Sequence, residues 1–446
     1  METTPPEASL GNFVAELTYD DLSGESIETI TRAFVDTVGV MLAGSTEGAG
    51  RKATESSGIE PTAADAATLL GIDADAPPDS VALRTGTASH ALDYDDLAWA
   101  MSGHPSVTLV PALLALAEET GASGRDLVAA YAAGFEAECA VADPVSPDHY
   151  EAGWHATATF GTFGAAAAAA HLLGLDEVEV SQALNIAASM PSGLKRNFGS
   201  MTKPLHAGLC SRSGVTAARL AADGFTADAA AISGERGFWD LYGEGGPEQF
   251  AEPDYEALQE RGIHIKAYPC CYFTHAAIAA AQALVEEGVD PETIEQVTVT
   301  ASAGAGDALH HADPDTGLEA KFSMQYAVAS ALVRERVSLS TFRDDAIENP
   351  AVQAVRERVE FVVDEDMAYD SHEASVRIVT EDGTYERHQE NPPGTHDDPL
   401  TDDELRAKFE ECAGTVLSET DVDRLYDVLS TLPAQEDVAS AVRVDH

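Results

Sequence analysis

Residues 161–175 read GTFGAAAAAAHLLGL, a run with almost no polar side chains. Residues 107–117 (VTLVPALLALA) are apolar all round in the same way. A helix with no polar face is one that neighbouring elements cover on every side. Neither run approaches the roughly 20 apolar residues that a membrane-spanning helix needs. We therefore expect two buried helices at the centre of a mainly α region.

Amphipathic helices surround this centre in the predicted fold. Apolar residues recur at three- and four-residue spacing from Ile27 to Met41. The same spacing runs from Leu127 to Cys139, after an N-cap candidate at Ser123. Such stripes are typical of helices that cover a core with one face. The first 265 or so residues therefore read as helices.

The pattern changes after about residue 290. Residues 294–300 (IEQVTVT) alternate with a period of two, as a half-buried strand does. Residues 360–363 predict another strand, and residues 376–379 and 384–387 predict a hairpin with its tight turn at Asp382-Gly383. The chain therefore turns from helices to a mixed α+β insert.

The last segment returns to a helical pattern. Thr401 and Glu404 form a capping-box signature before a helix that extends to Cys412. A further helix is expected around residues 422–429. The order along the chain is thus helices, a mixed insert, and helices again.

The chain of 446 residues is strongly acidic. It has 77 Asp and Glu against 25 Lys and Arg, a formal net charge of −52. Such a field repels nucleic acids and anionic membranes, so we expect neither as a partner. Five cysteines do not make a disulfide framework, and no apolar leader opens the sequence. We therefore expect a cytoplasmic protein.

Lysine is scarce, with six in the whole chain: Lys52, Lys195, Lys203, Lys266, Lys321 and Lys408. A surface dense in carboxylates and poor in lysine suits multimolar salt, where repulsion is screened within about 3 Å at 1 M. We therefore predict a halophilic protein. If selection removed surface lysines, those that remain are expected to be internal or functional.

Four clusters carry groups that move protons or hold carboxylates. The first comprises residues 90–96 (HALDYDD) and 103–106 (GHPS), and the second is residues 153–157 (GWHAT). A histidine in the second cluster precedes the alanine-rich helix, whose dipole favours the neutral imidazole and so suits a proton acceptor. Residues 199–208 (GSMTKPLHAG) offer Lys and His cations between glycines that permit close approach to a ligand, and residues 266–275 (KAYPCCYFTH) form the fourth.

Each cluster has a plainer interpretation, in which His104 is a loop histidine, His155 is a histidine satisfied within the core, and residues 199–208 are a structured loop with exposed charges. Asp95 and Asp96 are either solvated or capping acids, or ligands of a Mg²⁺ or Mn²⁺ ion. Cys270 and Cys271 are either buried thiols or part of a Cys–His nucleophilic site. A phosphate-binding GxxxxGK[ST], a GxGxxG behind a strand, HExxH and GxSxG are all absent from the sequence.

The four motifs, in this order, resemble those of the MmgE/PrpD family, which includes 2-methylcitrate dehydratase and cis-aconitate decarboxylase. With the helix–insert–helix order, the resemblance covers essentially the whole chain. It implies a mainly α fold, in which a large all-helical domain is built from both chain ends and a smaller α+β lid is inserted. The expected boundaries are residues 1–265 and 399–446 for the helical domain and 266–398 for the lid. The resemblance also implies a homodimer and no metal or organic cofactor.

The resemblance further implies an active site between the helical domain and the lid. The positions that match the family's pattern are Asp93, His104, His155, Lys203, His275 and Tyr326. Further cations near the motifs, expected to bind substrate carboxylates, are His206, Lys266 and Arg196. At one position the chain departs from the decarboxylase branch, since Leu97 stands where that branch has threonine.

A tricarboxylate substrate carries about three negative charges at neutral pH. A local cationic pocket must therefore overcome the protein's own field. Histidine titrates near pH 6.5 and can act as acid or base. We expect His104 or His155 as base and His275 as acid, or the reverse. Lys203 is expected to hold a carboxylate, Asp93 to orient a histidine or the substrate hydroxyl, and Tyr326 to donate a hydrogen bond from the lid.

The function that the resemblance implies is that of a cofactor-independent dehydratase of 2-methylcitrate or a related polycarboxylate. Two alternatives within the same fold are a cis-aconitate-type decarboxylase and a dicarboxylate epimerase. A third is a non-catalytic dimer that binds carboxylates.

Overall fold

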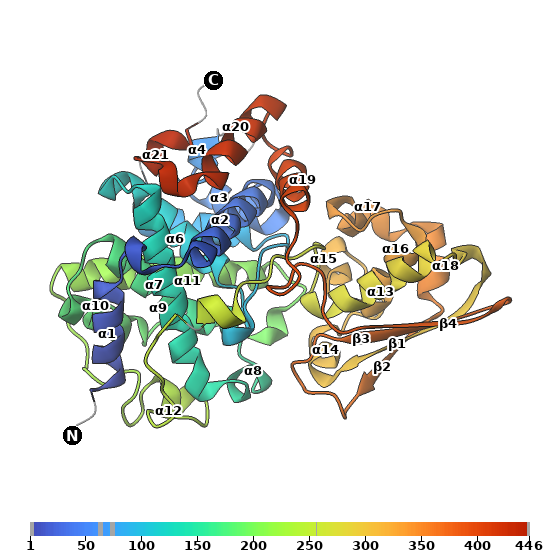
Figure 1. The fold of residues 1–446 in the computed structure, drawn as a ribbon, viewed down its shortest axis with the longest axis horizontal. Coiled ribbons are helices and arrows are strands. Elements are labelled where there is room, and N and C mark those ends of the chain that lie inside the picture. The colour runs from blue at the N-terminus through green and yellow to red at the C-terminus, as the bar shows by residue number, and fades with distance from the viewer. Residues whose placement is uncertain (1–3, 61–65, 72–75, 256, 444–446) are drawn as a thin grey trace.

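A computed structural model describes residues 4–60, 66–71, 76–255 and 257–443. Figure 1 shows two parts side by side, a large body of helices and a smaller part that contains the strands. The predicted fold class, mainly α with a smaller α+β part, is confirmed. Among the described residues, no helix combines the length and the apolar character needed to cross a membrane.

Two buried helices form the centre of the helical body. They are α6 (Ser106–Thr120) and α9 (Ala156–Leu172), and every residue of α9 up to Ala170 is buried. On α9 pack α7 (Gly124–Ala142) and α11 (Thr202–Ala222). The small side chains of α9 let these helices approach closely, which explains its unbroken run of alanines.

The two ends of the chain share one core. Helix α2 (Gly24–Gly44) is capped by Ser23 and packs against α19 (Asp402–Ala413), which begins with the predicted capping box. Figure 1 shows the red C-terminal helices, including α20 (Glu419–Ser430), beside the blue N-terminal ones. The remaining helices of this body are α1 (Pro6–Glu16), α3 (Gly48–Ser56), α4 (Ala66–Leu69), α5 (Pro78–Ser89), α8 (Asp148–Glu151), α10 (Glu177–Ala187), α12 (Phe238–Tyr242) and α21 (Val438–Ala441).

The lid contains a four-stranded sheet in the order β2-β1-β3-β4. Strand β1 (Ile294–Ser302) pairs in parallel with β2 (Val359–Asp364) and antiparallel with β3 (Ala374–Thr380), which forms a hairpin with β4 (Gly383–Gln389). The strand predictions are confirmed. The predicted turn is one residue late, because Thr380 pairs with Gly383 and leaves residues 381–382 as the turn.

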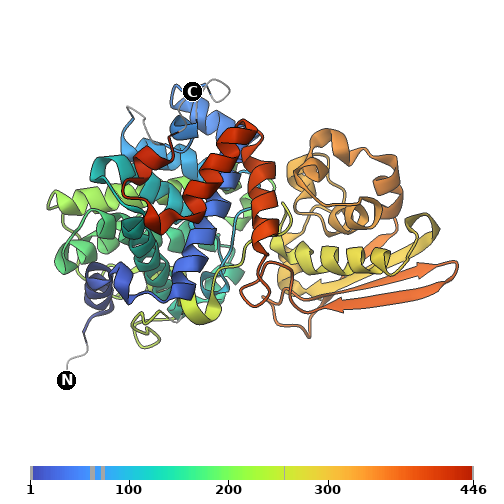
Figure 2. The same ribbon diagram turned by 45° about the horizontal axis from the view of Figure 1, so that its top comes forward.

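The lid helices cover one face of this sheet. Figure 2 shows α13 (His275–Glu286) and α16 (Met324–Val333) on the same side of the strands. The inward side chains of β1 and β3 join them in a second core, separate from that of the helical body. The other lid helices are α14 (Ala303–Ala308), α15 (Gly317–Ala320), α17 (Asp344–Ile347) and α18 (Pro350–Arg356).

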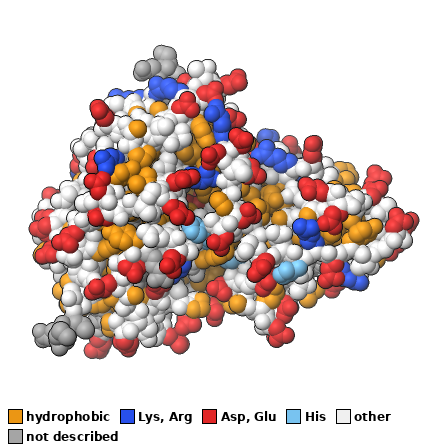
Figure 3. Space-filling view, in the orientation of Figure 1, with side chains coloured by type: hydrophobic (Ala, Val, Ile, Leu, Met, Phe, Trp, Pro, Cys, Tyr) orange, Lys and Arg blue, Asp and Glu red, His pale blue; other side chains and the backbone are white. Residues whose placement is uncertain are grey.

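The surface is dominated by carboxylates. Figure 3 shows acidic side chains over both parts of the visible face and few basic ones. Of the six lysines, Lys52 is exposed and Lys195 is half-buried. The other four are buried, with at most 6% of their surface exposed: Lys203, Lys266, Lys321 and Lys408. Lysine is therefore largely internal in this protein, as its scarcity predicts.

Candidate active site

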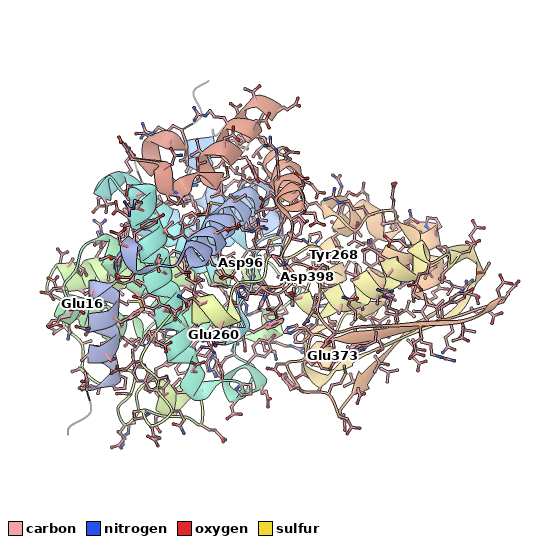
Figure 4. All side chains as sticks on the ribbon, viewed as in Figure 1. Glu16, Asp96, Glu260, Tyr268, Glu373 and Asp398 are labelled. Carbon is pink, nitrogen blue, oxygen red and sulfur yellow. The ribbon has the colours of Figure 1, made fainter. Side chains whose placement is uncertain are left out.

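A cavity of about 400 Å³ lies where the helical body meets the lid. Figure 4 places Asp96 within the helical body and Glu373 at the end of the lid nearest to it. Side chains from both parts line the cavity. The polar and aromatic ones that matter below are Asp93, His104, Tyr150, His155, Lys203, Lys266, Tyr272, Phe322, Tyr369, His372 and Glu373.

Asp93 lies in the loop that follows α5 and adopts a left-handed backbone, with φ of +52°. One of its carboxylate oxygens, Oδ1, accepts hydrogen bonds from Lys203 Nζ at 2.5 Å and from Lys266 Nζ at 3.1 Å. Burial by itself would raise the pKa of Asp93, but the two ammonium groups outweigh burial and hold that pKa well below its usual value. The site thus contains an ionised carboxylate shared by two cations.

Asp95 lies between two histidines. Its buried carboxylate accepts a hydrogen bond from His90 Nδ1 at 2.9 Å and lies 2.9 Å from His104 Nδ1. His104 Nδ1 also lies 2.7 Å from the carbonyl oxygen of Asp96. Burial lowers the pKa of both histidines, that of His90 to about 4. Both rings are therefore neutral near pH 7, with the proton on Nδ1.

This tautomer leaves His104 with its Nε2 lone pair free on the side away from Asp95. The His104 side chain lines the cavity and retains 14% of its exposure. The arrangement matches a general principle of acid–base catalysis, in which a carboxylate fixes one imidazole nitrogen and stabilises the cation formed when the other takes a proton.

A second histidine pair lies beside His90, whose ring is stacked 5.8 Å from that of His155. His155 is the N-cap residue of α9, and its Nδ1 shares a hydrogen bond with His206 Nδ1 at 3.0 Å. His155 Nε2 is buried and has no hydrogen-bond partner among the described residues. Burial lowers the pKa of His155 well below 6.5, and Lys203 adds to the effect. His155 is thus a neutral imidazole with one nitrogen available to a ligand.

The third sequence cluster is a helix start rather than a ligand-binding loop. Helix α11 begins at Thr202, so Lys203 and His206 lie in its first two turns. Gly208 faces α5 instead of the cavity, since a Cβ atom there would lie 2.1 Å from the carbonyl oxygen of Leu83. The expectation that this glycine lets a ligand approach is wrong; it lets two helices approach.

Four of the expected site residues do not line the cavity, among them His206, which contacts His155. His275 is the first residue of α13 and is fully buried, with its ring packed 4.8 Å from that of Tyr272. The Tyr326 hydroxyl lies in the lid core and donates to the carbonyl oxygen of Thr341 at 2.6 Å. Arg196 is exposed. The structure therefore brings together Asp93, His104, His155, Lys203 and Lys266, with His206 behind His155.

Two groups of residues at the site were not expected from the sequence. Asp95 was interpreted as a solvated acid, a capping acid or a metal ligand, and is instead enclosed between two imidazoles. Tyr150 and Tyr369 line the cavity from the body and the lid, and Lys195 joins them. Its Nζ lies 3.8 Å above the Tyr150 ring and 3.2 Å from the Tyr369 hydroxyl. The scarcity of lysine was the signal that could have found this contact.

The histidine–aspartate cluster also bears on the metal alternative. Within the described residues, His90, Asp95 and His104 have ligand atoms that all lie within 4.8 Å of one another. However, the Asp95 carboxylate already contacts Nδ1 of both rings, and Asp93 already carries two ammonium groups. A divalent ion would have to displace these hydrogen bonds and lie beside two cations, so the donor set fits a metal poorly.

The buried environment of the two thiols does not support the cysteine alternative. Cys271 lines the cavity, and burial raises the pKa of its thiol to about 11. Burial likewise raises the pKa of Cys270 to about 12. A thiol with such a pKa is almost entirely protonated near pH 7, whereas the thiolate is the nucleophile.

Comparison with known proteins agrees with this architecture. The sequence matches the MmgE/PrpD N-terminal domain over residues 8–251 and the MmgE/PrpD C-terminal domain over residues 268–432. It is 27% identical to the cis-aconitate decarboxylase of Mus musculus, an alignment that covers 98% of this chain and 92% of the mouse protein. It is 26% identical to that of Homo sapiens (96% and 92% covered) and 24% identical to that of Aspergillus terreus (96% and 93% covered). The two domain matches together span most of the chain, which therefore belongs to the MmgE/PrpD family.

Proposed function

We propose that this protein is a lyase that decarboxylates a tricarboxylate of the cis-aconitate type by histidine acid–base chemistry. The relatives named above are cis-aconitate decarboxylases. They favour the decarboxylase alternative over the dehydratase expected from the motifs. The observation that carries the proposal is the pair of buried ammonium groups, Lys203 and Lys266, that share Asp93 beside the cavity.

The two lysines supply what an anionic substrate requires. In a protein of net charge −52 they form a local cationic wall, and the Asp93 carboxylate orients both of them. Charge-assisted hydrogen bonds from an ammonium to a carboxylate are roughly twice as strong as neutral ones. These two lysines would therefore bind a substrate carboxylate despite repulsion from the net negative charge of the protein.

The charge balance of the site favours a proton donor once substrate is bound. Lys203 and Lys266 together balance Asp93 and Asp95, and the lid acids Asp370, Glu373 and Glu390 also line the cavity. A bound trianion leaves the cavity negative, which raises the pKa of His104 and favours the imidazolium that Asp95 stabilises. His104 then acts as the general acid.

Decarboxylation uses that proton in one balanced step. The carbon–carbon bond to one carboxylate breaks and releases CO₂, and its electron pair becomes a new double bond to the neighbouring carbon. The electron pair of the original double bond forms a new C–H bond. The proton comes from His104 Nε2 and goes to the carbon of that double bond that is farther from the departing carboxylate. The neutral imidazole recovers its proton from solvent before the next turnover.

Dehydration of 2-methylcitrate is the second candidate, favoured by one observation. Leu97, Phe198 and Phe322 give the cavity an apolar wall, which could accommodate a methyl group. Dehydration needs a base to take a proton from carbon and an acid to protonate the leaving hydroxyl. Neutral His104 and His155, both lining the cavity, would provide such a pair.

Proton and carbon NMR in deuterated, high-salt buffer distinguishes these reactions. The proposal predicts that cis-aconitate loses CO₂ and that one deuteron enters the product. A new double bond with loss of water from 2-methylcitrate would favour the dehydratase instead. Deuterium exchange without net change would indicate an epimerase, and binding without turnover a carboxylate-binding protein. We also propose a homodimer, which analytical ultracentrifugation in the same buffer tests.

A further inference from the structure

Three consecutive backbone carbonyls in the Asp93 loop each accept a hydrogen bond from a different buried lysine. The carbonyl oxygen of Leu92 accepts from Lys321 Nζ. The carbonyl oxygen of Asp93 accepts from Lys266 Nζ at 2.9 Å, and the carbonyl oxygen of Tyr94 accepts from Lys408 Nζ at 2.6 Å. We call residues 92–94 the lysine-held segment.

The three lysines come from three separate regions of the chain. Lys266 lies in the connection to the lid, Lys321 follows α15 in the lid, and Lys408 lies on α19 of the C-terminal return. Lys408 also donates to the carbonyl oxygen of Lys266 at 2.8 Å and pairs with Asp36 at 2.6 Å. In a chain with only six lysines, this convergence joins the helical body, the connection and the lid at one point.

Lys321 differs from the other two in its charge environment. It forms no ion pair with a described carboxylate, and burial lowers its pKa to about 8 although Asp93, Glu47 and Cys270 act in the opposite direction. Burying an ammonium group without a paired acid costs free energy. A lysine kept at this position without a paired acid points to a role other than stability.

The role of these lysines follows from the backbone peptide planes that their hydrogen bonds hold in place. The peptide planes that contain the Leu92 and Asp93 carbonyls flank the α-carbon of Asp93, so their orientations set its φ and ψ. A non-glycine residue in the left-handed region carries strain and persists only where its surroundings hold it. Lys321 and Lys266 hold these two planes, and Lys408 holds the next one.

We propose that Lys321 and Lys408 are positioning residues, which hold Asp93 in its left-handed conformation and thereby place the Lys203 ammonium at the cavity. Because Lys321 belongs to the lid, the geometry of the cationic wall depends on the docking of the lid against the lysine-held segment. The kinetic test of this inference rests on the proposed function, and the structural test does not.

The kinetic test is a double-mutant cycle of Lys321→Met and Asp93→Asn. If Lys321 acts through Asp93, Lys321→Met lowers kcat/KM at least about tenfold in the natural protein and less than about threefold in the Asp93→Asn background. Equal losses in both backgrounds would overturn the inference, because a merely structural role is additive. The matched control is Lys52→Met, at an exposed lysine of α3, which should change kcat/KM less than twofold.

The structural test needs no substrate. Crystal structures of Lys321→Met and Lys408→Met should show Asp93 outside the left-handed region and Lys203 Nζ withdrawn from its carboxylate. An unchanged Asp93 in both variants would overturn the inference. Where a methionine variant does not fold, the glutamine variant, which is shorter and uncharged but still polar, takes its place in both tests. If the natural protein turns over no tricarboxylate, the proposed function fails while these structures still decide the inference.

Discussion

Asp93, Asp95 and Asp96 lie within four residues of one another, yet their neighbours give them different protonation states. Asp93 is ionised by two lysines, and Asp95 by hydrogen bonds from two imidazoles. Asp96 faces a hydroxyl, that of Ser106, and burial raises its pKa well above the usual value, so that it is protonated. Asp93 thus binds two cations, Asp95 orients His104, and Asp96 is a neutral hydrogen-bonding group.

This difference predicts opposite results for two matched amide substitutions. Asp95→Asn removes the charge that stabilises the His104 imidazolium, so kcat should fall by about 10²–10⁴ with KM little changed. Asp96→Asn replaces a neutral acid with a neutral amide of the same shape and should leave kcat within about threefold. Steady-state kinetics of both variants test this, and equal losses in the two would contradict the assigned protonation states.

Lys203 is predicted to act mainly in binding. Truncating one partner of a buried charge pair costs about 2–5 kcal/mol, so Lys203→Ala should raise KM for a tricarboxylate by about 10²-fold or more. The reason is that the substrate carboxylate loses a cation and Asp93 is left with Lys266 alone. Titration calorimetry with citrate measures the same loss without turnover. Binding as tight as in the natural protein would remove Lys203 from the site.

The hydrogen bonds of Asp95 predict that chelators do not affect the reaction. The Asp95 carboxylate already contacts both imidazole Nδ1 groups, and Lys203 and Lys266 lie at Asp93, so a divalent ion bound there would lie beside two cations. Dialysis against EDTA, with the ionic strength held constant, should leave kcat within twofold. Loss of turnover that added Mg²⁺ or Mn²⁺ restores would show that His90, Asp95 and His104 bind a metal.

The sequence could predict which residue types belong to the site better than what they contact. Asp93, His104, His155 and Lys203 lie in recognisable motifs and meet at one cavity. Tyr326 matches the family's pattern too, but its hydroxyl donates to a carbonyl inside the lid. Whether a motif residue faces a cavity or a core depends on tertiary packing, which local spacing does not encode.

At the scale of the elements, α11 carries Lys203 and packs directly on α5, the helix that leads into the Asp93 loop. Gly208 is the point of closest approach, because a Cβ there would meet the Leu83 carbonyl oxygen at 2.1 Å and Thr87 Oγ1 at 2.3 Å. Gly208 therefore allows the close approach of these two elements, together with Gly86 of α5, where a Cβ would lie 2.9 Å from the α-carbon of Gly208.

Gly208→Ala should therefore destabilise the protein and impair the site together. Overpacking of this kind costs about 1–3 kcal/mol, so the thermal midpoint should fall and KM should rise. Gly24→Ala, at the first position of α2, is the matched control, since a Cβ there meets nothing within 4 Å. Equal thermal midpoints for the two variants would show that α11 and α5 can separate at no cost.

Elements with a clear period were predictable, and the start of α11 was not. Strand β1 alternates from Val297 to Ala301, after a register shift between Ile294 and Gln296. The apolar residues of α2 recur at three- and four-residue spacing, although all of residues 33–44 are buried. In residues 199–208 the glycines and Pro204 suggest a loop, although proline is tolerated in the first turn of a helix, where its missing N–H would be unpaired anyway. The local sequence there is compatible with a loop and with the start of a helix, and packing of α11 on α5 and α9 stabilises the helix.

At the scale of the whole molecule, a charge of −52 surrounds a cavity with a cationic wall. Repulsion among exposed carboxylates weakens as salt shortens the screening length from about 10 Å at 0.1 M to about 3 Å at 1 M. Dialysis from 2 M to 0.1 M salt should therefore lower the thermal midpoint by about 10 °C or more. A midpoint that stays constant or rises at low salt would contradict the halophilic character that we propose.

The central claim is that Lys203 and Lys266 bind a polycarboxylate in the cavity between helical body and lid. The most direct measurement is a crystal structure, in high salt, of the Asp95→Asn variant with cis-aconitate. We expect a carboxylate group of the ligand within hydrogen-bond distance of both lysine Nζ atoms, with His104 beside the double bond. A ligand bound elsewhere, or one in the cavity that contacts neither lysine, would contradict it.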